Sequence, residues 1–254
     1  GVPSEHLHAL RELLHIYVIE HEWAAATETA RLLETQAGES HAGEIAHFYC
    51  ERIELAMRRK NVEEARLLVE PLLKYVDATP RVPMTLARVA AAEGAAPEAI
   101  RWWKTVIEKT PDYAALVVGP LADAMAAQGD QAGATALLLD VTSRIATADV
   151  LEASLSRIAA WQGVAEAELL ARRFLEDHPS LSAYNAMMQM RLKGSPEDPM
   201  TKRVAGLLGQ NARRWSRYQC RKCGFLASGF AWHCLGCGAW DSYSPRRIED
   251  KKRG

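Results

Sequence analysis

The chain has 254 residues, and its 31 Lys and Arg balance 32 Asp and Glu, so overall charge gives no case for nucleic acid or an anionic membrane as the main partner. Hydrophobic residues make up 48% and aromatic residues only 7%, and alanine runs such as 24–26 and 90–92 favour an all-α fold. The longest apolar run, 113–118, is far shorter than the roughly 20 residues of a membrane span.

An alanine recurs along the chain at separations of 33 to 39 residues, at Ala26, Ala65, Ala99, Ala134 and Ala167. Apolar residues follow each alanine four and seven positions later, which places one buried stripe on one face of a helix. Gly94, Gly129 and Gly163 are expected to close the turn before the second helix of a unit. Lys60–Asn61 is expected to make the same turn, since Asn is the next best residue at such a cap.

These signals predict helix–turn–helix units of about 34 residues. First helices are predicted over 7–17, 43–56, 82–92, 114–127 and 150–161, and second helices over 22–35, 62–75, 97–109, 131–144 and 165–177. A helix over 182–192 begins an incomplete unit, residues 194–199 break it, and 200–214 form a last helix. The spacing resembles the tetratricopeptide repeat, which implies a right-handed solenoid whose usual work is to hold a peptide, helix or domain.

Four of the five cysteines form two C-x2-C pairs separated by ten residues, at Cys220, Cys223, Cys234 and Cys237. Two such turns place four thiolates at the corners of a tetrahedron around one metal ion. A glycine follows each pair, and the positive φ that glycine tolerates lets backbone amides point at the sulfurs. The metal is iron or zinc, because a closed four-thiolate shell suits structural zinc and the doubled CxxCG also resembles rubredoxin.

The cysteine segment is under thirty residues, so the metal must supply the folding energy that its core cannot. Basic residues at 213, 214, 217, 221 and 222 are expected to offset the net charge of −2 on the metal and four thiolates, in preference to forming a phosphate-binding patch. Four cysteines leave no open position for water, which indicates a chain without catalytic residues that is not an enzyme. Cys50 is expected to be a small core residue.

Residues 45–51, IAHFYCE, and the cysteine pattern of residues 218–240 resemble the lipopolysaccharide assembly protein B family of Gram-negative bacteria over essentially the whole chain. The resemblance implies a membrane anchor, cytoplasmic tetratricopeptide repeats and a rubredoxin-type domain packed on them, and carries the metal ligands onto the four cysteines. It implies a non-enzymatic adaptor that binds the lipid A pathway deacetylase and promotes its degradation by a membrane-bound AAA+ protease. An inner-membrane regulatory protein opposes this action.

We therefore expect a repeat array over 1–194, a connector over 195–216, a metal lobe over 217–245 and a basic tail over 246–254. The resemblance implies the cytoplasmic face of the inner membrane, reached only through a segment outside this chain. Two other interpretations stay open: a repeat-docked redox module with iron, and a zinc-ribbon nucleic-acid-binding protein. Glu249 and Asp250 in the tail count against the latter, so no nucleic acid is expected.

Overall fold

The computed structural model describes residues 3–194, 198–215 and 217–251. The chain forms two compact units, Gly1–Trp102 and Trp103–Gly254, which are described separately below. Among the described residues, no helix combines the length and the apolar character needed to cross a bilayer.

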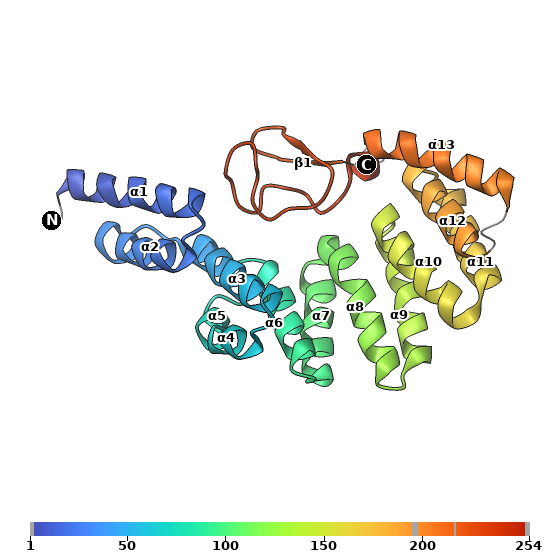
Figure 1. The fold of residues 1–254 in the computed structure, drawn as a ribbon, viewed down its shortest axis with the longest axis horizontal. Coiled ribbons are helices and arrows are strands. Elements are labelled where there is room, and N and C mark those ends of the chain that lie inside the picture. Colours follow the sequence, from blue (N-terminus) through green and yellow to red (C-terminus); the bar gives the residue numbers. More distant parts are fainter. Residues whose placement is uncertain (1–2, 195–197, 216, 252–254) are drawn as a thin grey trace. The chain divides into compact units, whose positions relative to one another are not determined.

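The first unit is built of helical hairpins, in which each helix packs on the next along the chain (Figure 1). Its helices are α1 (Ser4–Ile19), α2 (Trp23–Ala37), α3 (Ala42–Arg58), α4 (Val62–Leu67), α5 (Val69–Leu73) and α6 (Arg81–Ala92). The predicted apolar stripes contribute to the core: Ala26, Ala30, Leu33 and Leu72 are all essentially inaccessible to solvent. The periodic pattern therefore places these side chains as expected.

One predicted helix of this unit is divided. Residues 62–75 were expected to be continuous, but α4 ends at Leu67 and a second short helix, α5, runs from Val69 to Leu73. Pro71 explains the break, because it has no N–H to donate to the carbonyl of Leu67 and its ring collides with that carbonyl.

The turn before α4 also differs from the prediction. Lys60, and not Asn61, takes the left-handed conformation, with φ of 58°. Asn61 instead caps the start of α4, where its side chain accepts a hydrogen bond from the backbone N–H of Glu64 at 3.1 Å. An Asn side chain is a strong N-cap, so capping decides its conformation here. At the other predicted turns Gly94, Gly129 and Gly163 have positive φ, as expected.

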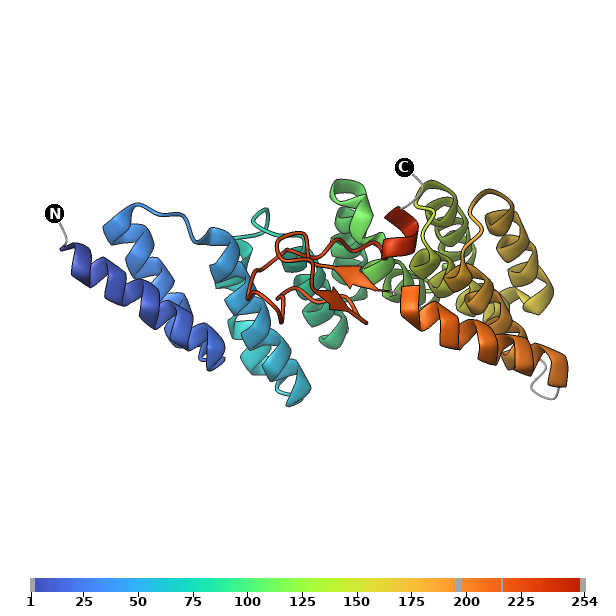
Figure 2. The ribbon, with the colours of Figure 1, turned by 90° about the horizontal axis from the view of Figure 1, so that it is seen from above.

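The second unit continues the hairpins, with α8 against α9 and α10 against α11 (Figures 1 and 2). Helix α7 (Ala96–Lys109) runs across the division; the helices that follow it are η1 (Pro111–Tyr113), α8 (Ala114–Ala127), α9 (Gln131–Arg144), α10 (Ala148–Gln162), α11 (Val164–Asp177), α12 (Leu181–Gly194) and α13 (Pro199–Trp215). The helix bounds lie within two residues of the predicted ones. Of the predicted break at 194–199, residues 195–197 lie outside the described residues, while Gly194 ends α12 and Pro199 begins α13.

A small lobe follows α13. Strands β1 (Tyr218–Gln219) and β2 (Leu226–Ala227) pair antiparallel, and a short helix, α14 (Ile248–Lys251), ends the described chain. The lobe's own core consists of Tyr218, Cys220, Cys234 and Tyr243. The predicted mostly helical, tetratricopeptide-like array with a small C-terminal four-cysteine lobe is thus confirmed, while the boundaries of its four segments stay a prediction.

Candidate metal centre

The structure brings together the four cysteines singled out in the sequence. Their Sγ atoms all lie within 4.8 Å of one another, with Cys220 and Cys237 3.8 Å apart and Cys223 and Cys234 3.7 Å apart. A tetrahedral ion with four metal–sulfur bonds of about 2.3 Å requires sulfur–sulfur edges of about 3.8 Å. The donor set and its spacing therefore fit a four-coordinate iron or zinc ion.

Each C-x2-C-Gly segment folds into a tight turn that aims two thiols the same way. The N–H of Gly224 donates to the carbonyl of Cys220 at 3.0 Å, and that of Gly238 donates to the carbonyl of Cys234 at 2.8 Å. The φ angles of the two glycines are 78° and 68°, a conformation that disfavours side chains. The backbone N–H of Gly236 points at the Cys234 sulfur, 3.4 Å away. The predicted need for glycine at 224 and 238 is confirmed.

Hydrogen bonds to sulfur favour the thiolate form that binds metal. The hydroxyl of Ser242 and nearby backbone N–H groups lower the pKa of Cys220 to about 6, against the opposing effect of burial. Burial raises the pKa of Cys234, but the hydroxyl of Tyr243 and the N–H groups of Cys237 and Gly236 lower it by more. The pKa values of Cys220 and Cys234 therefore lie below the ordinary thiol value, which favours the thiolate form at these two ligands.

Aromatic rings join the lobe to the repeats. Tyr113, in η1, stacks on Trp232 with ring centroids 5.5 Å apart and meets the edge of Phe230 at 6.1 Å. Phe230 in turn packs edge-on against Tyr218, next to the first cysteine. The contact lies directly before α8 and not on the last helices of the array. Nothing in the sequence indicated this position.

Asp149, at the start of α10, joins the same two parts by polar contacts. Its carboxylate accepts a hydrogen bond from the hydroxyl of Tyr218 at 2.8 Å and another from Nε of Arg247 at 3.0 Å. Burial and the charge of Asp149 raise the pKa of Tyr218, so the phenol remains a donor. Arg246 donates to Asp112 at 2.7 Å. The start of the expected basic tail is thus paired with acids of the repeats.

The other expected residues have varied surroundings. Arg221 donates to the backbone carbonyl of Asp241 at 2.8 Å, and the side chains of Arg213 and Arg214 lie outside the described residues. Cys50 is fully buried in α3, far along the chain from the cluster, and burial raises its pKa to about 12, as suits a core thiol.

Two adjoining cavities lie beside the lobe. They are formed mainly by α8, α10 and α12, each the first helix of its helix–turn–helix unit. One of about 240 Å³ is lined mainly by apolar residues of α10, α11 and α12, including Leu155, Ala159 and Met190. The other, of about 340 Å³, reaches Leu116 of α8 and Tyr218 of the lobe. The two share Glu152, Ser156 and Lys193, so they form one groove, which we call the α10 groove.

Sequence reasoning missed Tyr113, Asp149 and the α10 groove. Asp149 looks like an ordinary acidic residue in the first turn of a helix, and Tyr113 looks like a residue of a turn after a proline. Tyr218, two positions before the first cysteine, is the one local signal of an aromatic contact, and it does not predict which residues of the repeats take part.

Comparison with known proteins agrees with this architecture. The family model described as a rubredoxin metal binding domain matches residues 218–245. Lipopolysaccharide assembly protein B of Escherichia coli (strain K12) is 28% identical over 248 residues, which cover 94% of this chain and 62% of the relative. The protein of the same name from Haemophilus influenzae is 26% identical, covering 93% and 60%. This chain therefore spans about three fifths of the length of the curated relatives it matches.

Among solved structures, BtubC from P. vanneervenii matches with a TM-score of 0.50 at 14% identity, covering 81% of this chain and 90% of its own, which is a likeness of fold alone. Fold and site together define a class: helical repeat arrays of the tetratricopeptide kind that end in a rubredoxin-type four-cysteine lobe. The chain is thus similar over nearly all of its length to proteins named lipopolysaccharide assembly protein B, and its C-terminal lobe matches the rubredoxin metal binding domain, as its sequence motifs indicated.

Proposed function

We propose that the chain is a non-enzymatic adaptor in the control of lipopolysaccharide synthesis. In this proposal the repeats hold a segment of the lipid A pathway deacetylase and present it to a membrane-bound AAA+ protease, and an inner-membrane regulatory protein opposes them. The protein works at the cytoplasmic face of the inner membrane. Cys220, Cys223, Cys234 and Cys237 hold one iron or zinc ion that keeps the lobe folded. The names of the relatives and the repeat fold support a scaffold role.

The observation that carries the proposal is the α10 groove. Its floor is made of small and apolar side chains, while Glu152 and Lys193 stand at the junction of its two parts. Such a groove can hold apolar side chains of a peptide or helix and fix its direction by charge. Because Tyr218 lines one end, the lobe takes part in shaping the groove, which gives the metal a role in client binding without any chemistry at the metal.

Equilibrium binding of the chain to the purified deacetylase tests this proposal. Ser156 is an exposed groove residue whose hydroxyl donates to the carbonyl three residues earlier, Ala153. Ser156→Trp fills the groove and is expected to weaken binding at least tenfold. The matched control is Ser143→Trp, since Ser143 is also exposed, donates in the same way to the carbonyl of Asp140, and lies on α9 outside the residues that line the groove. Equal binding by wild type and Ser156→Trp would refute the groove as the client site.

A second candidate function, a redox module, has one observation in its favour. Cys223 and Cys237 are exposed, and Leu235, two positions before Cys237, is 84% exposed and offers an apolar surface through which a partner could approach the metal. Purified protein that carries iron, with a visible iron–thiolate spectrum that bleaches reversibly on reduction, would support this function. A colourless zinc protein would exclude it and leave the adaptor proposal untouched.

A further inference from the structure

The near-neutral charge of the whole chain conceals a strongly basic segment. Between positions 191 and 222 there are nine Lys or Arg and only two Asp or Glu, whereas the formal charge of the full chain is −1. Helix α13 lies at the centre of this segment. It contains Lys202, Arg203, Arg213 and Arg214, and no acidic residue. Such a local excess produces a positive potential that the overall balance does not reveal.

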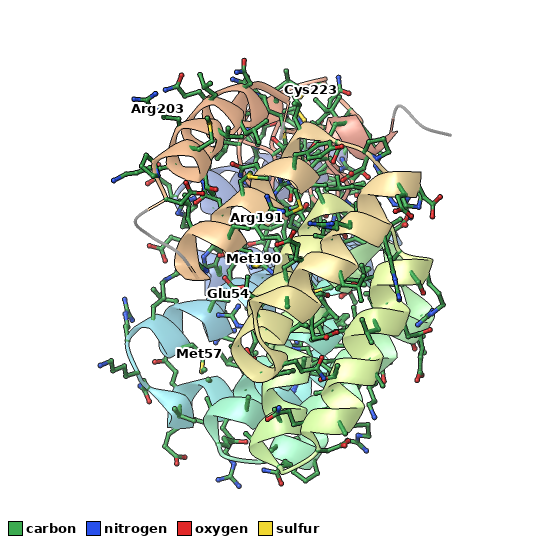
Figure 3. All side chains as sticks on the ribbon, turned by 90° about the vertical axis from the view of Figure 1, so that its right-hand side faces the viewer. Glu54, Met57, Met190, Arg191, Arg203 and Cys223 are labelled. Atoms are coloured by element: carbon green, nitrogen blue, oxygen red, sulfur yellow. The ribbon has the colours of Figure 1, made fainter. Side chains whose placement is uncertain are left out.

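Most of the circumference of α13 is open to solvent. Among the helices and strands that the structure describes, α12 is the one on which it packs extensively, through a face that includes the buried Ala205. Met200, Arg203 and Leu207 stand at offsets of 0, 3 and 7 residues, which places them on one outward face. Met200 is 68% exposed and Leu207 is 63% exposed. Arg203 projects from α13 away from the neighbouring helices (Figure 3). Lys202 is also exposed and lies at the edge of this face, about 100° round the helix from Arg203. We call Met200, Arg203 and Leu207, with Lys202 at their edge, the α13 face.

An ordinary end helix of a repeat array does not explain this composition. Terminal repeats carry a polar outer face that keeps the array soluble, and two large apolar side chains at such exposure act against that purpose. The charges also differ from those on α12, where Arg191 is paired with Glu168. Within the described part of the chain, no carboxylate lies at ion-pair distance from Lys202 or Arg203. The α13 face therefore combines uncompensated cations with exposed apolar side chains.

We propose that the α13 face lies on the surface of an anionic phospholipid bilayer. Lys202 and Arg203 attract the phosphate groups, while Met200 and Leu207 enter the boundary between headgroups and acyl chains. Basic residues attract anionic lipid surfaces, and apolar residues on the same helix add a contribution that salt does not screen. The occupant is a bilayer, because exposed cations beside exposed apolar side chains on one helix match the phosphate groups and acyl chains that a lipid surface offers together.

Co-sedimentation of the full chain with vesicles tests the proposal. We expect binding to vesicles of phosphatidylethanolamine with phosphatidylglycerol, and at least tenfold weaker binding to vesicles of phosphatidylcholine alone. Lys202→Glu with Arg203→Glu should lower binding to the anionic vesicles at least tenfold. The charge-matched control is Arg58→Glu with Arg59→Glu, since these two arginines are exposed at the end of α3, and it should bind like wild type.

A second variant separates the two contributions. Met200→Gln with Leu207→Gln should weaken binding to anionic vesicles while leaving its dependence on salt unchanged. Circular dichroism and metal content confirm that each variant is folded.

Equal binding to neutral and anionic vesicles, or a charge-reversed α13 variant that binds like wild type, would overturn the proposal. Failure of wild type to bind vesicles, with salt-sensitive binding of an acidic amphipathic peptide instead, would overturn it in favour of a protein partner. Deacetylase binding by these variants reports on the adaptor function separately.

Discussion

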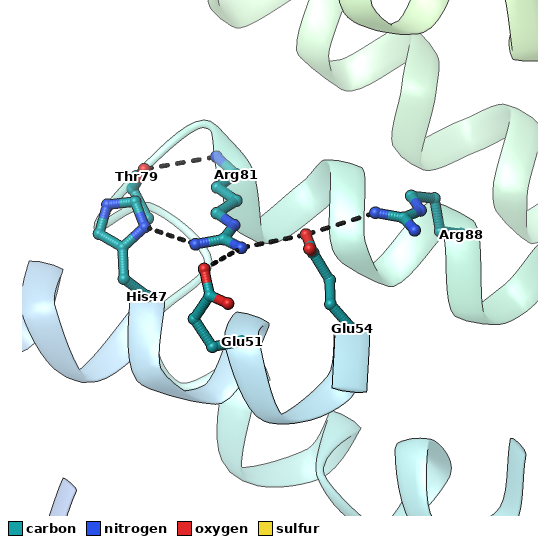
Figure 4. A network of polar contacts seen from close by, with 6 residues as sticks. All are labelled: His47, Glu51, Glu54, Thr79, Arg81 and Arg88. Carbon is teal, nitrogen blue, oxygen red and sulfur yellow. Dashed lines mark hydrogen bonds and ion pairs between the residues drawn. The ribbon is translucent and has the colours of Figure 1, made fainter. Parts of the chain in front are cut away.

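Two charged clusters, one in each unit, use ion pairs and hydrogen bonds for different purposes. In the first unit Arg81 of α6 inserts between two glutamates of α3, with a nitrogen 2.7 Å from Glu51 and 3.0 Å from Glu54 (Figure 4). His47 lies 3.4 Å from the same guanidinium. The Arg81 side chain is only 3% exposed, so its charge is stabilised by protein partners and not by water. This cluster locks two helices of the array together.

In the second unit the centre is an acid instead of a base. Asp149 of α10 receives hydrogen bonds from Tyr218 in the lobe and from Arg247 beyond it, residues 69 and 98 positions away in the chain. The Arg81 cluster joins helices that would pack on apolar side chains in any case. The Asp149 cluster fastens a lobe whose own fold depends on a metal. The comparison teaches that similar ion pairs can strengthen a core or attach a separately stabilised part.

Metal removal should have the largest effect and should distinguish the lobe most clearly from the repeat array. Structural zinc contributes roughly 10–16 kcal/mol in small metal domains, far more than a lobe of this size gains from its core. Cys234→Ser, or treatment with a strong chelator, should unfold the lobe and release Tyr218 from Asp149, while the helical content of the array persists. Limited proteolysis checks this through rapid cleavage within 217–251. A lobe as protected without metal as with it would show that the cysteines do not depend on an ion.

Arg81→Met should have the next largest effect, confined to the first unit. It leaves Glu51 and Glu54 without their shared cation, and loss of one partner of a buried ion pair costs about 3–5 kcal/mol. Hydrogen exchange at the amides of α3 and α6 measures that loss. Arg88→Met is the control, because the Arg88 side chain is 54% exposed and pairs with Glu54 at the surface, which predicts about 0–1 kcal/mol. Similar losses in both variants would contradict the special role of Arg81.

Asp149→Asn should act on the second unit, and more mildly. It removes the charge that Arg247 and Tyr218 bind, and hydrogen bonds to charged groups are worth about 1.5–3 kcal/mol. We expect faster proteolysis of the lobe with normal metal content, which distinguishes detachment from metal loss. Asp112→Asn removes the exposed pair with Arg246 and should cost less than about 1 kcal/mol. If metal content fell together with protection from proteolysis, Asp149 would contribute to the stability of the metal site itself.

The sequence predicted what local chemistry determines. Apolar spacing and glycine turns gave most helix bounds to within two residues, although α1 begins three residues before its predicted start and the helix predicted over 62–75 is divided. The two C-x2-C-Gly segments gave four thiols that the structure brings together. It did not reveal Asp149 or Tyr113, because their partners lie about 70 to 120 residues away and nothing local distinguishes an acid that binds a distant lobe from one that favours a helix start. The division at Pro71 was readable from the sequence, since a proline inside a helix removes a donor.

The smallest effect we predict is a pH dependence of the contacts around the Asp149 cluster. Burial, together with the charges of Asp149 and Glu249, raises the pKa of Asp250 to about 6, although the N–H of Ala148 and the charge of Arg247 oppose this. The unfolded value is about 3.9, so the folded state holds the proton more tightly. The stabilisation is therefore complete below about pH 4 and is lost as the pH rises through about 6.

The attachment of α14 to α10 should accordingly be weaker at pH 7.5 than at pH 5.5. Asp250→Asn cannot ionise, so its attachment should not weaken over this range. Because acid also releases metal from thiolates, the informative quantity is the ratio of cleavage rates at residues 246–251 between wild type and Asp250→Asn, measured with metal bound. That ratio should rise from pH 5.5 to pH 7.5. A constant ratio would mean that Asp250 ionises at its ordinary pKa, and that the Asp149 cluster fastens the lobe independently of pH in this range.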